Sequence, residues 1–128
     1  MKLFRTVYKK GFAKSYKVYK EDAIMTGELK LVEEVLSDLV KISLKGEIDI
    51  FTSNELKEKL YNIVDTNKKD LLIDCKELNY IDSTGLGIFV AALKKAKQYE
   101  KKIVILNLKD NIKKLFIITG LDKIFQIN

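Results

Sequence analysis

Residues 71–100 constrain the fold most, because a short apolar run there is followed by a capped helix pattern. The run Leu71, Leu72 and Ile73 is bounded by charged residues and is too short for helical periodicity, which predicts a buried strand over 71–75. After a predicted turn, apolar residues recur at helical spacing and lysines lie largely on the other face. The apolar positions are Leu86, Phe89, Val90, Leu93 and Ala96, and the lysines are Lys94, Lys95 and Lys97.

The start of this helix is marked by Asp82, Ser83 and Thr84, whose side-chain oxygens all suit an N-cap. Gly85 and Gly87 allow a sharp turn or a close approach of other atoms. We therefore expect Ser83 at an exposed helix N-terminus, directly after a buried strand. The residues alone leave two roles open for Ser83. It caps the helix, or it is a phosphorylation site whose roughly −1.5 to −2 added charges switch binding beside Asp82 without refolding.

The rest of the chain alternates strand and helix patterns. A hairpin is predicted over 28–34 and 39–45, with residues 46–49 ending its second strand, and helices are predicted from Thr52 and from Asp110. Gly120 is expected to stop the last helix, and strands are predicted over 103–108 and 123–127. The order is β-β-α-β-α-β-α-β. It predicts an α/β fold with a single sheet of mixed, mostly parallel strands and helices chiefly on one face.

The positive charge is concentrated at the N-terminus. Residues 1–27 hold seven of the 24 Lys/Arg and two of the 18 Asp/Glu, a net of +5, so the remainder of the chain nets +1. We divide the chain into a basic aromatic N-terminal extension, 1–27, and a domain, 28–128. The extension has apolar residues at helical spacing. It is interpreted either as an amphipathic helix on an anionic membrane or nucleic acid, or as a helix, strand or tail associated with the domain or a second copy.

Composition excludes several kinds of chemistry. The chain has no His, which removes the usual general base and the commonest metal ligand, and its acidic residues are scattered. Glu47 and Asp49 are interpreted as solvated or capping carboxylates, and no phosphate-binding glycine loop is present. We expect a protein that is not an enzyme and that holds no cofactor or metal.

The single cysteine and the hydropathy predict a cytoplasmic protein. Cys75 cannot form an internal disulfide and is predicted to be a buried thiol in a reducing compartment. We find no apolar run near the roughly 20 residues that span a bilayer, and no signal peptide.

At several motifs the sequence resembles STAS domains, specifically the stand-alone anti-sigma factor antagonists. The resemblance covers about residues 28–128, and its most specific part is D-S-x-G-L-G followed at the expected distance by T-G-L-D. The matching pieces are residues 46–49 (GEID), 52–56 (TSNEL), Asp74, 80–87 (YIDSTGLG) and 119–125 (TGLDKIF).

This resemblance implies a bacterial switch protein. Its unmodified form binds an anti-sigma factor with serine-kinase activity and so frees a sigma factor. The kinase then phosphorylates the serine after the family aspartate, which lowers affinity, and a metal-dependent serine phosphatase reverses the modification. That serine matches Ser83, with Thr84 as a minor candidate. The implied partner surface is Gly46, Glu47, Asp49, Asp82, Ser83, Thr84, Gly85 and Leu86.

No direct contact with nucleic acid is expected of such a protein. The alternative function is a scaffold subunit of a stress-sensing or membrane-associated STAS assembly, in which residues 1–27 contact the membrane.

Overall fold

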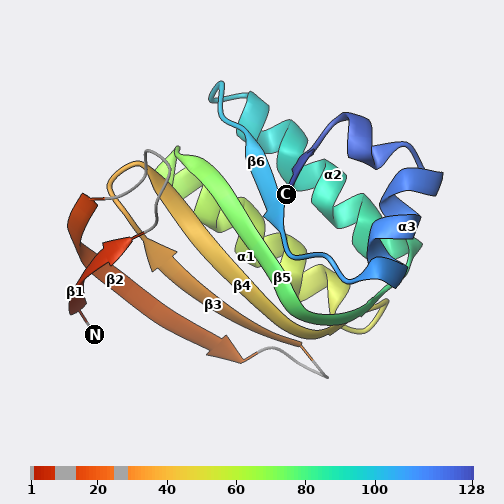
Figure 1. The fold of residues 1–128 in the computed structure, drawn as a ribbon, viewed down its shortest axis with the longest axis horizontal. Helices are drawn as coiled ribbons and strands as arrows, with labels where there is room; N and C mark the ends of the chain where they lie inside the picture. Colours follow the sequence, from red (N-terminus) through yellow and green to blue (C-terminus); the bar gives the residue numbers. More distant parts are fainter. Residues whose placement is uncertain (1, 8–13, 25–28) are drawn as a thin grey trace.

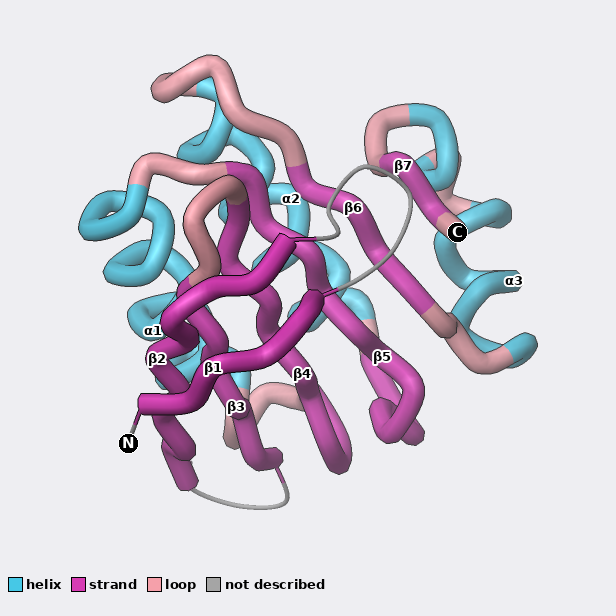
Figure 2. Tube along the Cα trace, turned by 60° about the vertical axis from the view of Figure 1, so that its left-hand side comes forward, coloured by secondary structure: helices cyan, strands magenta, loops and turns pink. Residues whose placement is uncertain are grey.

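A seven-stranded sheet forms the centre of the fold, with its strands in sequential order (Figures 1 and 2). The computed structural model describes residues 2–7, 14–24 and 29–128, with side chains from residue 29 onward. Four strands pair antiparallel in turn: β1 (Lys2–Val7), β2 (Lys14–Ile24), β3 (Leu29–Val35) and β4 (Leu39–Ile48). Three more follow β4 in parallel: β5 (Asp70–Ile81), β6 (Ile103–Leu106) and β7 (Gln126–Ile127).

Helices connect the parallel strands, because a parallel pair needs a crossover. They are α1 (Ser53–Asn67), α2 (Ser83–Lys97) and α3 (Asp110–Ile118), and a 3-10 turn, η1 (Leu121–Lys123), precedes β7. α1 and α2 pack against each other on one face of the sheet, whereas α3 lies near the β6–β7 edge (Figure 2).

The main core lies between the sheet and these helices. Phe89 of α2, Phe116 of α3 and Phe125 form an aromatic cluster with ring centroids 5.9–6.5 Å apart. All three rings are buried, and the edge-to-face contacts that Phe125 makes with the other two add to the stability that burial supplies. The cluster fixes α3 against α2, which explains how a nine-residue helix is held at the edge of the sheet.

The predicted order of elements over 28–128 is confirmed, together with the single mixed sheet and the helices chiefly on one face. Gly120 has a φ of 77° directly after the C-cap of α3, as expected of a helix stop. Asp110 is the first residue of α3 rather than its N-cap, and Lys109 holds the cap position without a side-chain bond.

The end of β5 and the start of β7 were predicted wrongly. The turn expected after Cys75 does not form: β5 continues to Ile81, because β4 also continues beyond residue 45 and pairs with it. Lys45 lies opposite Glu77 after a first register shift, and Ile48 lies opposite Ile81 after a second. The last strand is only Gln126–Ile127, since residues 121–123 form η1. Register of this kind depends on the partner strand, which local patterns do not contain.

Of the alternatives left open for the N-terminal segment, the strand associated with the domain is confirmed for residues 2–7 and 14–24, and the helix is wrong there. These residues form β1 and β2, and β2 pairs with the outer edge of β3, with Tyr19 opposite Val35 and Ile24 opposite Lys30. The sheet therefore has as many antiparallel as parallel pairs when the two N-terminal strands are included. The predicted apolar side of the segment, and its contact with a membrane, concern side chains outside those described.

Cys75 lies in the core on β5, as predicted, and is fully buried. Desolvation in this apolar site raises the pKa of its thiol to about 12, with a smaller contribution from Asp74. The thiol is therefore protonated and unreactive at neutral pH.

Candidate functional site

The candidate site lies where β4 and β5 end side by side. Ile48 and Ile81, the last residues of the two strands, are paired in the ladder, and the N–H of Asp82 donates to the carbonyl of Ile48 at 3.3 Å. Because β4 and β5 are parallel, the loop after β4 and the N-terminus of α2 leave the same edge of the sheet. Two segments far apart in the sequence are thus brought together.

Asp82 caps α2. Its backbone is extended (φ −108°, ψ −173°), and its Oδ1 accepts a hydrogen bond from the N–H of Gly85 at 3.1 Å. Ser83 is the first helical residue, and its side chain is exposed. Within residues 29–128 the Ser83 hydroxyl has no hydrogen-bond partner. The interpretation of Ser83 as the cap is wrong, because Asp82 holds the N-cap position and its carboxylate accepts from the N–H of Gly85.

Asp49 organises the loop between β4 and α1. Its carboxylate accepts from the N–H of Phe51 at 2.8 Å and from that of Thr52 at 3.2 Å. The Thr52 hydroxyl accepts from the Asp49 N–H at 3.0 Å and donates to the Glu47 carbonyl at 3.1 Å. Asp49 does not cap α1, whose N-cap is Thr52, and its carboxylate bonds instead give the loop before the helix a defined shape. Thr52 stands at the N-cap of α1 but makes no side-chain cap bond.

This loop presents two apolar side chains that the sequence analysis missed. Ile50 is 66% exposed and Phe51 is 79% exposed, whereas Thr52 and Ser53 beside them are buried. The sequence did contain a signal for this surface. Two large apolar residues lie in the predicted turn before Thr52, where polar residues are normally found. Exposed apolar side chains beside an exposed serine indicate a surface for protein contact.

The remaining predicted residues divide by burial. Thr84 is exposed beside Ser83, and Gly46, Glu47 and Asp49 are partly exposed. Gly85 and Leu86 are buried, so their side of α2 packs on the sheet. Gly85 and Leu86 can therefore affect binding only by setting the position of α2 on the sheet.

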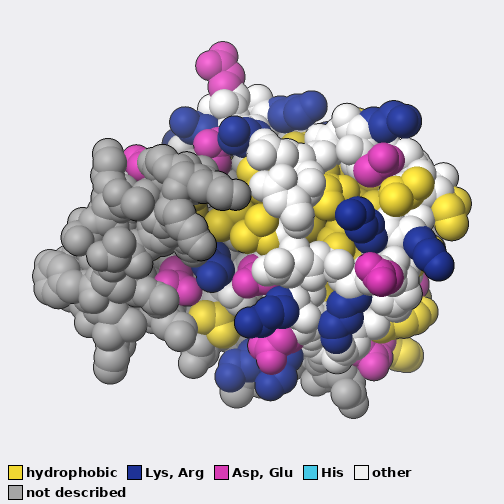
Figure 3. All heavy atoms as spheres, in the orientation of Figure 1, with side chains coloured by type: hydrophobic (Ala, Val, Ile, Leu, Met, Phe, Trp, Pro, Cys, Tyr) yellow, Lys and Arg dark blue, Asp and Glu magenta, His cyan; other side chains and the backbone are white. Residues whose placement is uncertain are grey.

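A second apolar area lies on the C-terminal elements. Ile117, Ile118 and Ile124 are exposed on α3 and just after η1. Figure 3 shows hydrophobic side chains at the edge of the molecule where α3 lies and across the middle of the described face, with lysines and acidic side chains interspersed among them. In the described part of the chain, no His, Cys, Asp or Glu side chains gather as a metal site. No helix there is both long enough and apolar enough to cross a membrane.

Comparison with known proteins agrees with this geometry. The STAS domain profile matches residues 30–128. The chain is 38% identical over 88 residues to the anti-sigma-B factor antagonist of Staphylococcus aureus, covering 69% of this chain and 82% of the relative. It is 40% identical over 96 residues to the anti-sigma-B factor antagonist of Listeria monocytogenes, covering 75% of this chain and 84% of the relative.

Solved structures give the same result. An anti-sigma factor antagonist from Mycobacterium paratuberculosis has a TM-score of 0.66 at 27% identity, covering 77% of this chain and 84% of that one. The anti-sigma factor antagonist SpoIIAA in its unphosphorylated form has a TM-score of 0.60 at 15% identity, covering 86% and 87% of the two chains, which shows a shared fold. The chain belongs to the STAS domain family, and its relatives there are anti-sigma factor antagonists.

Proposed function

We propose that the chain is an anti-sigma factor antagonist switched by phosphorylation of Ser83. In its unmodified form it binds an anti-sigma factor that is also a serine kinase, and a sigma factor is released. The phosphorylated form no longer binds until a serine phosphatase restores it. The protein acts in the cytoplasm by protein contact alone, without catalysis of its own and without touching nucleic acid.

One observation carries this proposal: the Ser83 hydroxyl is exposed and has no task in the described fold. Asp82 caps α2, so modifying the neighbouring serine breaks no structural hydrogen bond. The relatives named above support the class of partner, because they are named for antagonism of anti-sigma-B factor. SpoIIAA, whose fold the chain shares, has also been solved in a phosphorylated form.

Electrostatics explains why modification affects binding rather than folding. A phosphate at Ser83 adds roughly −1.5 to −2 charges at the first position of α2, where the helix dipole and the free amides stabilise an anion. The same charge lies beside Asp82 and in front of any partner docked on the Asp49 loop. It therefore repels or displaces that partner while the fold stays intact.

The partner surface that we propose joins two exposed features. Ser83 and Thr84 contribute its hydroxyl groups, and Ile50 and Phe51 contribute its apolar part. Because Asp49 holds the loop by hydrogen bonds to its own backbone, the two apolar side chains are presented without a large ordering cost on binding.

The test uses each serine-kinase anti-sigma factor of the host, purified. Incubation with ATP and peptide mass spectrometry should find one phosphate on Ser83 and none in Ser83→Ala. Ser83→Asp should weaken binding more than about tenfold, or about 1.4 kcal/mol. Ser37→Asp is the matched control. It makes the same substitution at an exposed serine in the β3–β4 turn, at the other end of the sheet, and should bind like the wild type.

Equal affinity of Ser83→Asp and the wild type would show that charge does not exclude the partner. Stable binding without phosphate transfer would indicate that the protein is a constitutive antagonist or a scaffold subunit. Treating the phosphorylated protein with a serine phosphatase should restore binding, and failure to do so would remove the reversible switch.

A further inference from the structure

Gly85 and Gly87, the two glycines that follow Ser83, lie in different surroundings. A Cβ on Gly85 would lie 2.5 Å from Ile81 Cγ1 and 2.6 Å from Ile48 Cγ2, so no side chain fits there. A Cβ on Gly87 would meet no atom within 4 Å, and Gly87 is exposed within the helix. Glycine destabilises a helix by about 1 kcal/mol relative to alanine. The described fold gains nothing from Gly87, and the missing side chain leaves the helix backbone open to close approach by another chain.

Gly87 lines one end of a surface groove of about 350 Å³ between α1 and α2. Tyr61 of α1 forms one side of the groove. The other side is formed by Val90, Ala91, Lys94 and Lys95 of α2 and by its C-cap residue, Gln98. Residues four apart on a helix share a face, so Ser83 lies one turn beyond Gly87 on the same side of α2. The groove therefore leads to the proposed phosphorylation site.

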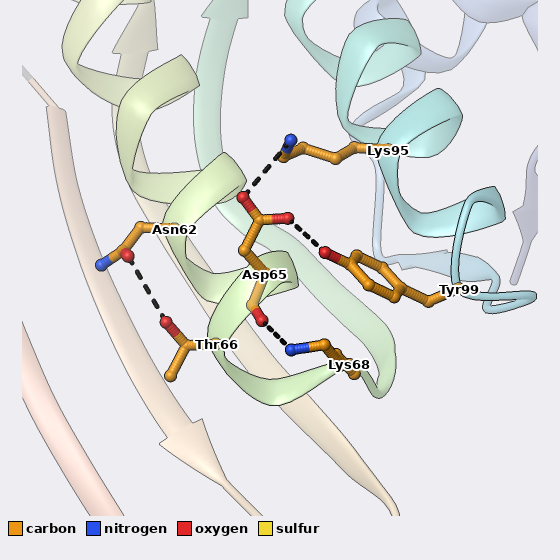
Figure 4. A network of polar contacts seen from close by, with 6 residues as sticks. All are labelled: Asn62, Asp65, Thr66, Lys68, Lys95 and Tyr99. Carbon is orange, nitrogen blue, oxygen red and sulfur yellow. Dashed lines mark hydrogen bonds and ion pairs between the residues drawn. The ribbon is translucent and has the colours of Figure 1, made fainter.

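The walls of the groove are held together by a polar network. Asp65 of α1 accepts from the Tyr99 hydroxyl at 2.8 Å and pairs with Lys95 of α2 at 3.3 Å (Figure 4). The Lys95 ammonium also lies 4.8 Å from the centre of the Tyr61 ring. The hydrogen bond from Tyr99, together with Lys95, lowers the pKa of Asp65, so the carboxylate stays charged at neutral pH. The groove has a defined shape before any partner arrives.

Its charge is positive. Lys94 is exposed and forms no ion pair with the other residues of 29–128, and Lys57 lies 5.5 Å from the Tyr61 ring on the α1 side. Asp65 offsets only the charge of Lys95, to which it is paired. At the other end of the surface Asp82 is negative. A complementary partner therefore carries acidic groups opposite the lysines.

We propose that this groove is the docking site for an acidic helix of the anti-sigma factor, with its backbone passing close to Gly87. This inference rests on the proposed function and names the partner chemistry of that site. Helices pack with axes 8–10 Å apart, and a glycine at the crossing point permits the closest approach. A phosphate on Ser83 then faces an acidic segment directly, which gives the charge switch a physical target.

The experiment measures binding of the host anti-sigma factor that binds the wild-type protein most tightly in the assay above. Lys94→Glu should weaken binding about tenfold and reduce its dependence on salt. Lys76→Glu is the matched control, because it reverses an exposed lysine on the opposite face of the sheet and should change binding less than about twofold.

Substitutions at Gly87 distinguish a binding role from a structural role, because they should change stability and affinity in opposite directions. Gly87→Ala should raise the melting temperature and yet weaken binding about threefold, and Gly87→Leu should weaken it about tenfold or more in a folded protein. A higher melting temperature with unchanged affinity for both variants would overturn the proposal, as would tighter binding by Lys94→Glu.

Two further outcomes separate this inference from the proposed function. Ser83→Asp could lose binding while all groove variants bind with wild-type affinity. That result would support the proposed function and refute the groove as the docking site. No binding of the wild-type protein to any host anti-sigma factor would remove both. Sedimentation velocity of the protein alone completes the test, because a dimer that Gly87→Leu dissociates would assign the groove to a second copy and refute the acidic partner.

Discussion

Replacing Gly85 by alanine tests how closely α2 approaches the strand ends that position Ser83. The added Cβ would lie 2.5 Å from Ile81 Cγ1 and 2.6 Å from Ile48 Cγ2, far inside ordinary van der Waals contact. Both isoleucines are buried, at 2% and 0% exposure, and their β-branched side chains have little rotamer freedom. Overpacking of this kind costs about 1–3 kcal/mol, against which the helix gains about 1 kcal/mol from losing a glycine. Two contacts this short place the cost in the upper part of that range, about 2–3 kcal/mol, so after the gain of about 1 kcal/mol we expect a net loss of about 1–2 kcal/mol.

The assay is urea and thermal unfolding of the full chain. Gly85→Ala should lower the melting temperature by several degrees, on the order of 3–8 °C. Gly87→Ala, two residues away in the same helix, should raise it, because the added Cβ meets nothing. Ile48→Ala removes the Cγ2 that blocks the new methyl, so the double variant Gly85→Ala with Ile48→Ala should lose less than the sum of the single losses. Wild-type stability in Gly85→Ala would refute the reasoning.

Three further predictions follow from single contacts. Asp82→Ala should lower the free energy of unfolding by about 1 kcal/mol, whereas Asp82→Asn keeps a capping oxygen and should lose much less, as measured by urea titration. The Cys75 thiol has a higher pKa in the folded state than its ordinary 9.0, so the folded protein binds more protons and its stability should fall between about pH 9 and 12. Cys75→Ala should remove that part of the pH dependence, and an unchanged slope would contradict the assignment. Tyr99→Phe removes the main cause of the lowered Asp65 pKa, so an NMR titration should find that pKa closer to its ordinary value. An unchanged Asp65 pKa would show that the neighbouring lysines maintain the shift without Tyr99.

Local chemistry explains what could be predicted around the site. An acidic residue, a serine and a threonine before an apolar periodic stretch place a helix start at Asp82 whatever the rest of the chain does. The structure confirms that helix over Ser83–Lys97 and the exposure of Ser83. Sequence could not choose between Asp82 and Ser83 as the cap, since both side chains suit the role. The choice depends on which residue has the extended backbone, and Asp82 has it.

Long-range pairing explains most of what could not be predicted. Residues 76–81 read as a turn because charged and polar side chains interrupt the apolar run. They form a strand because β4 extends far enough to pair with them. The N-terminal segment has helical apolar spacing, yet residues 14–24 include β-favouring Tyr16, Val18 and Tyr19, and the edge of β3 offers unpaired backbone groups. A local pattern does not reveal whether such an edge is available.

Capping and periodicity act over a few neighbouring residues, and local patterns therefore predict the order of strands and helices over 28–128, the helix start at Asp82 and the position of Ser83. The difference between Gly85 and Gly87 comes from packing in the folded chain. The two glycines stand in one short motif and have the same intrinsic freedom, but Ile48 from a distant strand packs against the first and nothing in the described fold approaches the second. The same residue type is therefore a packing requirement at one position and an open approach to the helix at the other, because the difference lies in neighbours that folding brings together.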